Sequence, residues 1–264
     1  MNINLGDVQE TALITVSIKA NETLRKKPRV RDEVSVEIIK TLGINTEHYD
    51  KFMSHEGVIA RTVMLDRMVR SFIEKNPSCV IVNLGAGFDN RFSRVDNGKI
   101  SWFDLDLPDS IAVRKKVFPE RKRVSMISGS VLESSWCPAV LDEIKNKNAP
   151  VLFLAEGLFM YLTLNEIAQL LSILKRNFKC GTLIAEQNNP VMVERQNLHD
   201  TVKNTKAVFR SGTWSGKEIS ALCEGINFVD EHSFNKEMKK YSFRGWLFAA
   251  LLPKMNDRWA TFQW

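Results

Sequence analysis

Two glycines and two aspartates stand at a spacing that suits a nucleotide-like ligand. Gly85 and Gly87 follow residues 79–84, an apolar run typical of a short buried strand. Glycine lets another group approach the backbone closely, because no Cβ is in the way. The next strand pattern ends in Asp104, and Asp106 follows two positions later. An acid at this place can accept hydrogen bonds from ribose hydroxyls, or it can cap the following helix, and both aspartates are candidates.

A parallel sheet is needed to bring these residues to one edge, and the sequence pattern predicts one. Strand-like runs alternate with helical periodicity, which indicates an α/β fold. Strands are expected at 79–84, 100–104, 123–127, 150–155, 181–187 and 227–234, with helices near 108–118, 138–147 and 163–178. The last apolar run, residues 241–252, is expected to add an antiparallel strand.

Three more helical patterns precede the sheet, and a bare doubly wound sheet has no place for them. The second is expected to begin after Asp32 and to stop at Gly43. We therefore expect residues 1–76 to form a helical cap over the carboxyl edge. Residues 77–264 would form the core of the same single domain, with a lid insertion near 188–212.

The composition is that of a globular protein that works in a reducing, cytoplasmic compartment. Of 264 residues, 44% are hydrophobic and 26% charged, and no run reaches the roughly 18 apolar residues of a membrane span. No secretory signal is expected in the first ten residues. The four cysteines contain no C-x-x-C pair, so neither zinc nor a redox pair is indicated. The net charge is +6, but the basic residues 25–31 are better explained as a solvated connector than as a nucleic-acid site.

Three motifs together resemble the leucine carboxyl methyltransferase family, whose bacterial members include tetracenomycin-type polyketide O-methyltransferases. They are V-N-L-G-A-G-F-D-N-R at residues 82–91, W-F-D-L-D-L-P at 102–108 and A-E-G-L-F-M-Y-L at 155–162. The likeness extends from about residue 15 to about residue 250. It implies a class I methyltransferase with a Rossmann-like sheet of seven strands, the last reversed. It also implies S-adenosyl-L-methionine as methyl donor, S-adenosyl-L-homocysteine as product, and no metal.

The resemblance assigns roles to particular residues of this chain. Asp106 matches the ribose acid best and Asp104 second, while Arg61 matches an arginine that pairs with the donor carboxylate. Lys19 aligns with a second basic residue, and Glu156 with a glutamate near the donor amino group. The expected cofactor-binding set is Lys19, Arg61, Gly85, Ala86, Gly87, Asp104, Asp106, Ser130, Val131 and Glu156.

One position in this set departs from the family pattern. Ser130 stands where the family usually has an acid that holds the adenine amino group. A hydroxyl accepts only a weaker, neutral hydrogen bond. Donor affinity is therefore expected to be lower, unless a backbone group takes over.

Methyl transfer from a sulfonium requires an aligned nucleophile and the exclusion of water, and a base is optional. A phenol benefits from a base, whereas a carboxylate needs none. Tyr161 and His199 are the catalytic candidates. Tyr161 follows the A-E-G turn, and His199 lies in the expected lid.

Three classes of function remain open on the sequence alone. The favoured reading is an O-methyltransferase acting on a hydroxyl or carboxylate of a small molecule, as a monomer or homodimer without membrane or nucleic-acid partners. A protein C-terminal carboxyl methyltransferase is the second reading. A non-catalytic donor-binding protein is the third, and a nicotinamide-dependent dehydrogenase is disfavoured because the glycine turn lacks the full G-x-G-x-x-G and offers no acid–base pair.

Overall fold

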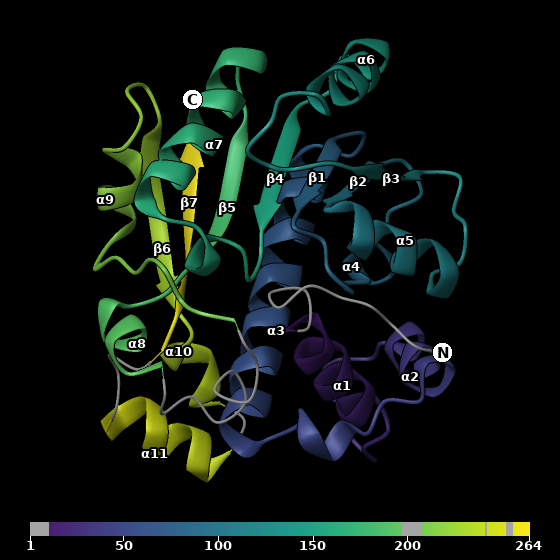
Figure 1. Ribbon diagram of the computed structural model, residues 1–264, viewed down its shortest axis with the longest axis vertical. Helices are drawn as coiled ribbons and strands as arrows, with labels where there is room; N and C mark the ends of the chain where they lie inside the picture. The colour runs from purple at the N-terminus through teal and green to yellow at the C-terminus, as the bar shows by residue number, and fades with distance from the viewer. Residues whose placement is uncertain (1–10, 197–206, 241, 252–255) are drawn as a thin grey trace.

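The centre of the protein is a seven-stranded sheet. The structure is a computed structural model that describes residues 11–196, 207–240, 242–251 and 256–264. The strands are β1 Val80–Leu84, β2 Ser101–Asp106, β3 Val124–Ser128, β4 Val151–Ala155, β5 Thr182–Gln187, β6 Asn227–Ser233 and β7 Arg258–Gln263. Their order is β3-β2-β1-β4-β5-β7-β6, with β1 to β5 parallel and β7 antiparallel to both β5 and β6 (Figure 1). The predicted α/β sheet with a reversed last strand is confirmed.

The strand order reverses at β1, which places the carboxyl ends of β1, β2 and β4 together. In register, Val80 of β1 lies between Ser101 of β2 and Val151 of β4. The chain leaves β1 toward β2 on one side and returns to β4 on the other. Open α/β sheets bind ligands outside the carboxyl ends of the strands at such a reversal.

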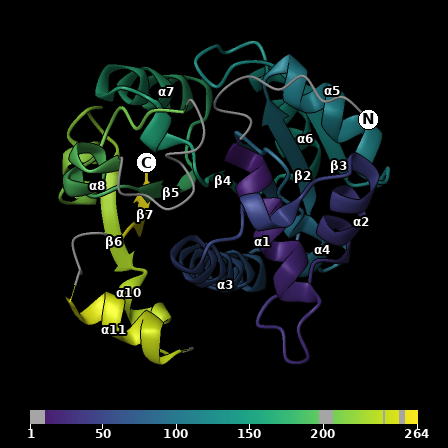
Figure 2. The same cartoon turned by 60° about the horizontal axis from the view of Figure 1, so that its bottom comes forward.

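Helices at both ends of the chain gather at this carboxyl edge, below the arrowhead of β4 in Figure 1. The helices before the sheet are α1 Ala12–Thr23, α2 Glu33–Leu42 and α3 Phe52–Lys75, with a short η2 Thr46–His48. Figure 2 brings the edge forward and shows α1 next to α3 on one side, with α10 and α11 on the other. As predicted, Asp32 begins α2 by accepting a hydrogen bond from the Ser35 N–H at 3.1 Å, and Gly43 ends it with a φ of 65°.

The helices of the core connect the strands and complete the edge. They are α4 Arg91–Val95, α5 Pro108–Val117, α6 Cys137–Lys147, η3 Phe159–Tyr161, α7 Leu164–Asn177, α8 Pro190–Glu194, α9 Gly216–Ser220, α10 Asn235–Met238 and α11 Phe243–Leu251. Helix α7 begins with a capping box, in which Thr163 and Glu166 bond each other's backbone N–H. No helix in the described parts of the chain is long and apolar enough to cross a membrane.

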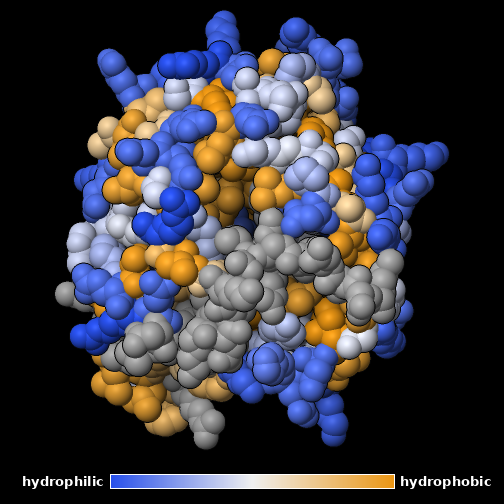
Figure 3. Space-filling view, in the orientation of Figure 1, coloured by the Kyte–Doolittle hydropathy of each residue, from blue (hydrophilic) through white to orange (hydrophobic). Residues whose placement is uncertain are grey.

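The prediction of a strand at residues 241–252 is wrong. The described part of this run forms α11, and the antiparallel strand lies further on, in β7. A continuous apolar run carries no strict alternation, so it cannot by itself separate a strand from a helix. Helix α11 leaves Phe243 75% and Leu251 69% exposed, and its apolar side chains gather at the lower left of Figure 3.

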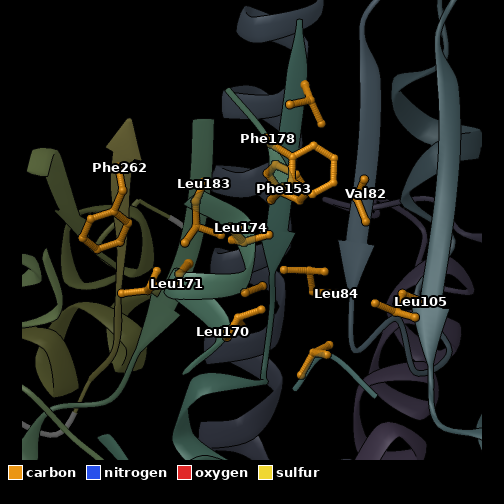
Figure 4. Packing of buried hydrophobic residues seen from close by; sticks show 14 of the residues in the cluster. Val82, Leu84, Leu105, Phe153, Leu170, Leu171, Leu174, Phe178, Leu183 and Phe262 are labelled. Carbon is orange, nitrogen blue, oxygen red and sulfur yellow. The ribbon is translucent and has the colours of Figure 1, made fainter. Parts of the chain in front are cut away.

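Alternation along the central strands builds a core on each face of the sheet. On one face, Val82, Leu84 and Phe153 pack against leucines of α7, as Figure 4 shows. On the other face, Ile81 and Leu152 pack against the second half of α3. Complete burial of one such side chain contributes about 1.5–3 kcal/mol. The strand ends are therefore held firmly enough to position the residues that follow them.

Candidate active site

A cavity of about 500 Å³ opens at the carboxyl edge of the sheet. Figure 3 shows a hollow among apolar side chains near the end of β4. We call its two sides the polar half and the apolar half. The polar half follows β1 to β4 and includes Lys19, Arg61, Gly85, Ala86, Gly87, Asp89, Asp106, Ser130, Val131 and Glu156. The apolar half comes from the cap and from later segments, and includes Met53, Met160, Tyr161, Met192, Phe209, Phe234, Met238, Phe248, Asn256 and Asp257.

The glycine turn after β1 has a backbone that other residues do not readily adopt. Gly85 and Gly87 have φ values of 66° and 47°. A Cβ on Gly85 would lie 3.1 Å from Cδ1 of Leu158. The turn is held from β2 and α5, because the Gly87 N–H donates to Asp106 Oδ2 at 2.6 Å and Arg114 donates to the Gly87 carbonyl at 2.6 Å. Backbone and carboxylate therefore lie together at the cavity wall.

The structure separates the two aspartates that the sequence left as alternatives. Asp106 lines the cavity and accepts from the backbone N–H groups of Gly87 and Leu107 and from the side chain of Ser110. Burial raises the pKa of Asp106, although these bonds oppose the rise. Asp104 does not line the cavity: its carboxylate accepts from Arg114 at 2.5 Å and from the Trp102 indole at 2.8 Å. Only Asp106 has free lone pairs on the ligand side.

Behind the polar half lies a buried network of ion pairs. The fully buried Arg91 bonds Asp66 at 2.8 Å, Asp89 at 2.9 Å and Glu156 at 2.7 Å. Burial alone would raise the pKa of Glu156, but Arg91 and Arg61 lower it below its usual value. The carboxylate of Glu156 is thus kept charged at the cavity wall.

The two cations predicted to meet a ligand carboxylate lie in the cavity wall and are already paired. Lys19 Nζ lies 3.0 Å from Asp89 Oδ1, and Arg61 Nη1 lies 3.2 Å from both oxygens of Glu186. Arg61 Nε is 3.0 Å from Glu156 Oε1 but out of line for a hydrogen bond, so this buried N–H lacks an acceptor. Such an N–H suits an anionic ligand group, which would add to the existing pairs.

Ser130 and Val131 follow β3 and line the cavity. The Ser130 hydroxyl accepts from the Leu132 N–H at 3.1 Å. Ser130 therefore places a small neutral hydroxyl in the cavity wall, where the acid usual in the family would place a negative charge. Together, the polar half offers an apolar slot at Val131, a ribose acceptor at Asp106, and charges of both signs for an amino acid.

The apolar half contains one of the two catalytic candidates. Tyr161 lies in η3 and lines the cavity. Burial raises the pKa of Tyr161 to about 12, against a hydrogen bond with Thr11 that lowers it. The phenol therefore stays protonated near neutral pH and can donate a hydrogen bond, but it is poorly suited to act as a base. His199 lies outside the described residues, as does the part of the expected lid at 197–206.

The sequence reasoning missed two acids that line the cavity, Glu186 and Asp257. Glu186 carries a signal similar to that of Glu156, a carboxylate directly after a run of apolar residues, although it lies within β5. Burial and the charge of Glu156 raise the pKa of Glu186, despite Arg61. Asp257 precedes β7 and carried no sequence signal. The described residues contain no cluster of three or more His, Cys, Asp or Glu side chains placed to bind a metal.

Similarity to known proteins agrees with this geometry. The model of the leucine carboxyl methyltransferase family matches residues 12–175. The tetracenomycin polyketide synthesis O-methyltransferase TcmP of Streptomyces glaucescens is 26% identical over 233 residues, which cover 88% of this chain and 84% of that protein. The S-adenosyl-L-methionine-dependent methyltransferase dpfgK of Gibberella zeae is 28% identical over 67% of this chain and 63% of its own length.

Solved structures share the fold at much lower identity. A DUF574 family protein from Streptomyces avermitilis has a TM-score of 0.54 at 12% identity, covering 94% of this chain and 95% of that one. The N-methyltransferase NodS of Bradyrhizobium japonicum, solved with S-adenosyl-L-homocysteine, has a TM-score of 0.51 at 11% identity, covering 88% and 98%. These likenesses concern the fold alone.

Proposed function

This chain belongs to the leucine carboxyl methyltransferase family, and on that premise we propose that it methylates an oxygen of an apolar small molecule. It is an S-adenosylmethionine-dependent methyltransferase. The observation that carries the proposal is the cavity of about 500 Å³, in which a charged half at the strand reversal and a half lined by methionine and aromatic side chains belong to the same space. The relative that matches most of this chain acts in polyketide synthesis, which supports an apolar acceptor here.

The polar half would hold the donor through three kinds of contact. Asp106 would accept from the ribose hydroxyls, and the turn at Gly85 and Gly87 would let the backbone approach the donor. Arg61 would bind the carboxylate of the methionine moiety, and Glu156 its ammonium group. When bound, the donor supplies an electrophilic methyl group on a sulfonium. The residues of this chain orient the donor, neutralise its amino-acid charges and exclude water.

The wider setting is part of the same proposal. We place the enzyme in the cytoplasm, as a monomer or homodimer, in one domain with residues 1–76 as its cap. All four cysteines are free thiols, which suits a reducing compartment. The basic segment 25–31 is partly turned inward, because Arg29 bonds Glu22 at 3.0 Å and Glu56 at 2.9 Å. Because Arg29 is paired inside the protein, fewer positive charges of this segment remain to bind a nucleic acid.

The test is a calorimetric titration of the purified protein with S-adenosylmethionine, S-adenosylhomocysteine and NADH. We expect the first two to bind and NADH to give no heat beyond dilution. Binding of NADH alone would contradict the proposal. The search for turnover then separates an enzyme from a non-catalytic binding protein.

A further inference from the structure

Helix α11 presents a row of large apolar side chains to solvent. Phe243, Trp246, Leu247 and Leu251 are 75%, 46%, 40% and 69% exposed. Their spacing places them on one side of the helix, and the rings of Phe243 and Trp246 stack with centroids 6.1 Å apart. They contribute to the apolar surface at the lower left of Figure 3. Soluble proteins rarely leave such a patch without a partner.

The opposite side of α11 faces the cavity. Ala249 is 2% exposed and packs in a cluster with Ala60 and Met238. Phe248 packs against the same cluster, and both Phe248 and Met238 line the apolar half of the cavity. Helix α11 therefore stands between the apolar half of the cavity and the solvent.

The surface beside the apolar row is basic. Lys236, Lys239 and Lys240 lie in α10 or directly after it, and all three are exposed. Within the described part of residues 235–251, the sole acid is Glu237. Its carboxylate is buried and pairs with Lys240 at 2.9 Å. The negative charge is thus turned inward, and the lysines give this surface a positive charge.

A second segment with basic and apolar side chains lies beside the start of α11. Glu56 of α3 connects the two, because it pairs with Arg29 at 2.9 Å and accepts from the Ser242 hydroxyl at 3.4 Å. The connector that contains Arg29 begins with Leu24, which is 71% exposed, and continues with the exposed basic residues 25–27. This connector and α11 both lie at the lower edge of the molecule in Figures 1 and 2.

We propose that this end of the molecule docks on the surface of an anionic lipid bilayer, with the apolar row of α11 inserted among the acyl chains. Helices that bind in this way combine Trp, Phe and Leu with nearby basic side chains, and they lie in the plane of the surface. The lysines would then meet the negative charge of the lipid headgroups. From the sequence, no membrane partner was expected, because its apolar runs are too short to span a bilayer. The nine residues of α11 cannot span one either, but surface docking does not require that length.

Area and charge favour a bilayer over a second copy of this chain. Taking about 150–250 Å² for each whole side chain, the four exposed fractions leave an apolar area of roughly 350–600 Å². A standard protein–protein interface takes about 800 Å² from each partner. A second copy would also bring the same lysines to the interface, and their charges would repel. An anionic bilayer complements both the apolar row and the lysines.

Docking in this orientation would place the apolar half of the cavity close to the lipid. Phe248 lies on the cavity side of α11, so this helix would separate the cavity from a phase in which apolar small molecules dissolve. If the chain methylates such a molecule, as proposed above, the bilayer would concentrate the acceptor at the site. Binding to a bilayer needs no methyl transfer, and it can therefore be tested apart from the proposed function.

The first experiment measures sedimentation of the full chain with vesicles of phosphatidylcholine alone or of phosphatidylcholine and phosphatidylglycerol in equal amounts. We expect binding to the mixed vesicles, weakened by added salt. Phe243→Ser combined with Trp246→Ser should weaken it at least about tenfold, because two large side chains no longer gain from leaving water. The matched control is Trp214→Ser, at a tryptophan that is 54% exposed and precedes α9. It should bind as the wild type does.

The second experiment tests the charges with a matched pair of double variants. Lys236→Glu combined with Lys239→Glu should weaken binding to the mixed vesicles at least about tenfold, because the lysines no longer attract the headgroups. Lys115→Glu combined with Lys116→Glu makes the same change in net charge at exposed lysines of α5, which lies away from α11 in Figure 1. This control should keep most of the binding.

All these variants should bind S-adenosylhomocysteine as the wild type does, which shows that they are folded. Docking would be refuted if the wild type did not sediment with the mixed vesicles, or if Trp214→Ser weakened binding as much as the α11 variant. Light scattering provides a further check. A wild-type dimer that the α11 variant converts to a monomer, without any vesicle binding, would assign the apolar row to a second copy instead. Failure of the wild type to bind S-adenosylhomocysteine would refute the proposed function and leave the vesicle result standing.

Discussion

The two halves of the cavity are built in opposite ways. In the polar half, charged side chains from distant segments are paired with one another: Lys19 with Asp89, Arg61 with Glu156, and Arg91 with three acids. In the apolar half, short segments contribute methionine and aromatic side chains around Asp257. A donor that is the same in every member of a family suits a site with fixed charges. An acceptor that varies suits a wall made of adaptable side chains.

Each buried charge in the polar half needs a full set of ionic or hydrogen-bonding partners. Buried ions lose hydration, and they are tolerated only when each has partners with good geometry. The polar half should therefore be the part of the site whose integrity is tied to folding. The apolar half should tolerate substitutions at a lower cost in stability.

The largest expected effect comes from breaking the network behind the polar half. Arg91→Leu removes a side chain that bonds Asp66, Asp89 and Glu156, and leaves three buried carboxylates with fewer partners. We expect the free energy of unfolding to fall by about 3–5 kcal/mol, as is usual when one partner of a buried pair is lost. Urea denaturation followed by circular dichroism would measure it.

The control for this change is Arg176→Leu, at an exposed arginine of α7. Exposed substitutions usually alter stability by less than about 0.5 kcal/mol. If the two variants were equally stable, the network would not be the framework that we describe. The comparison of the two halves would then lose its basis.

The ion-pair network also shows which features of the structure could be predicted from the sequence and which could not. The strands, the capping residues Asp32 and Thr163, and the glycine turn were predictable because each rests on local signals of periodicity or capping. The pairing inside the network was not, because it joins residues far apart in the chain. Arg91, for example, stood in the sequence only as the last residue of the motif at 82–91, whereas in the structure it bonds Glu156 from 65 positions away.

The second prediction sharpens the distinction between two acids of β2. Asp106→Ala should weaken S-adenosylhomocysteine binding by about 1–3 kcal/mol, because charge-assisted hydrogen bonds to the ribose are lost. Asp104→Ala should leave the affinity nearly unchanged but reduce stability, since Arg114 and the Trp102 indole lose their acceptor. Calorimetry and thermal unfolding of both variants would show the two effects. Equal affinities in the two variants would refute the assignment.

The third prediction concerns the start of α3, which contributes Met53 to the apolar half. There His55 bonds Asp50 at 2.8 Å and Glu22 at 2.9 Å. Burial would lower the pKa of His55, but these two carboxylates raise it above 6.5. The stabilisation is therefore fully present below pH 6.5 and is lost as the pH rises through the raised value.

The test compares wild type with His55→Gln over this pH range. When the pH is raised from below 6.5 to above the raised pKa of His55, the free energy of unfolding of the wild type should fall by about 1 kcal/mol more than that of the variant. Urea denaturation at several pH values would measure the difference. Parallel pH profiles in the two proteins would contradict the prediction.

The apolar half explains why the acceptor is harder to infer than the donor. The family match covers residues 12–175 and ends before Glu186 and Asp257. Asp257 stands in no motif, and its place in the cavity depends on the antiparallel return of β7 beside β5. The same return was misplaced in the prediction from sequence, because the apolar run of α11 was taken for the strand. The position of Asp257 depends on the pairing of strands that are far apart in the chain, so no local sequence pattern could predict it.

The smallest expected effect tests the one departure within the polar half. Ser130→Asp would restore the acid that the family resemblance implies for the adenine amino group. A carboxylate there could still accept from the Leu132 N–H, as the Ser130 hydroxyl does at 3.1 Å. We expect S-adenosylhomocysteine to bind about 0.5–1 kcal/mol more tightly, because the new hydrogen bond is charge-assisted on a partly exposed wall.

Calorimetry of Ser130→Asp beside Ser130→Asn would separate the effect of charge from that of shape. The asparagine has a similar size without the charge, so it should gain less affinity. If neither variant bound more tightly, a backbone group would already satisfy the adenine. Serine at position 130 would then not lower the affinity for the donor, and the polar half would already have a partner for each polar group of the donor.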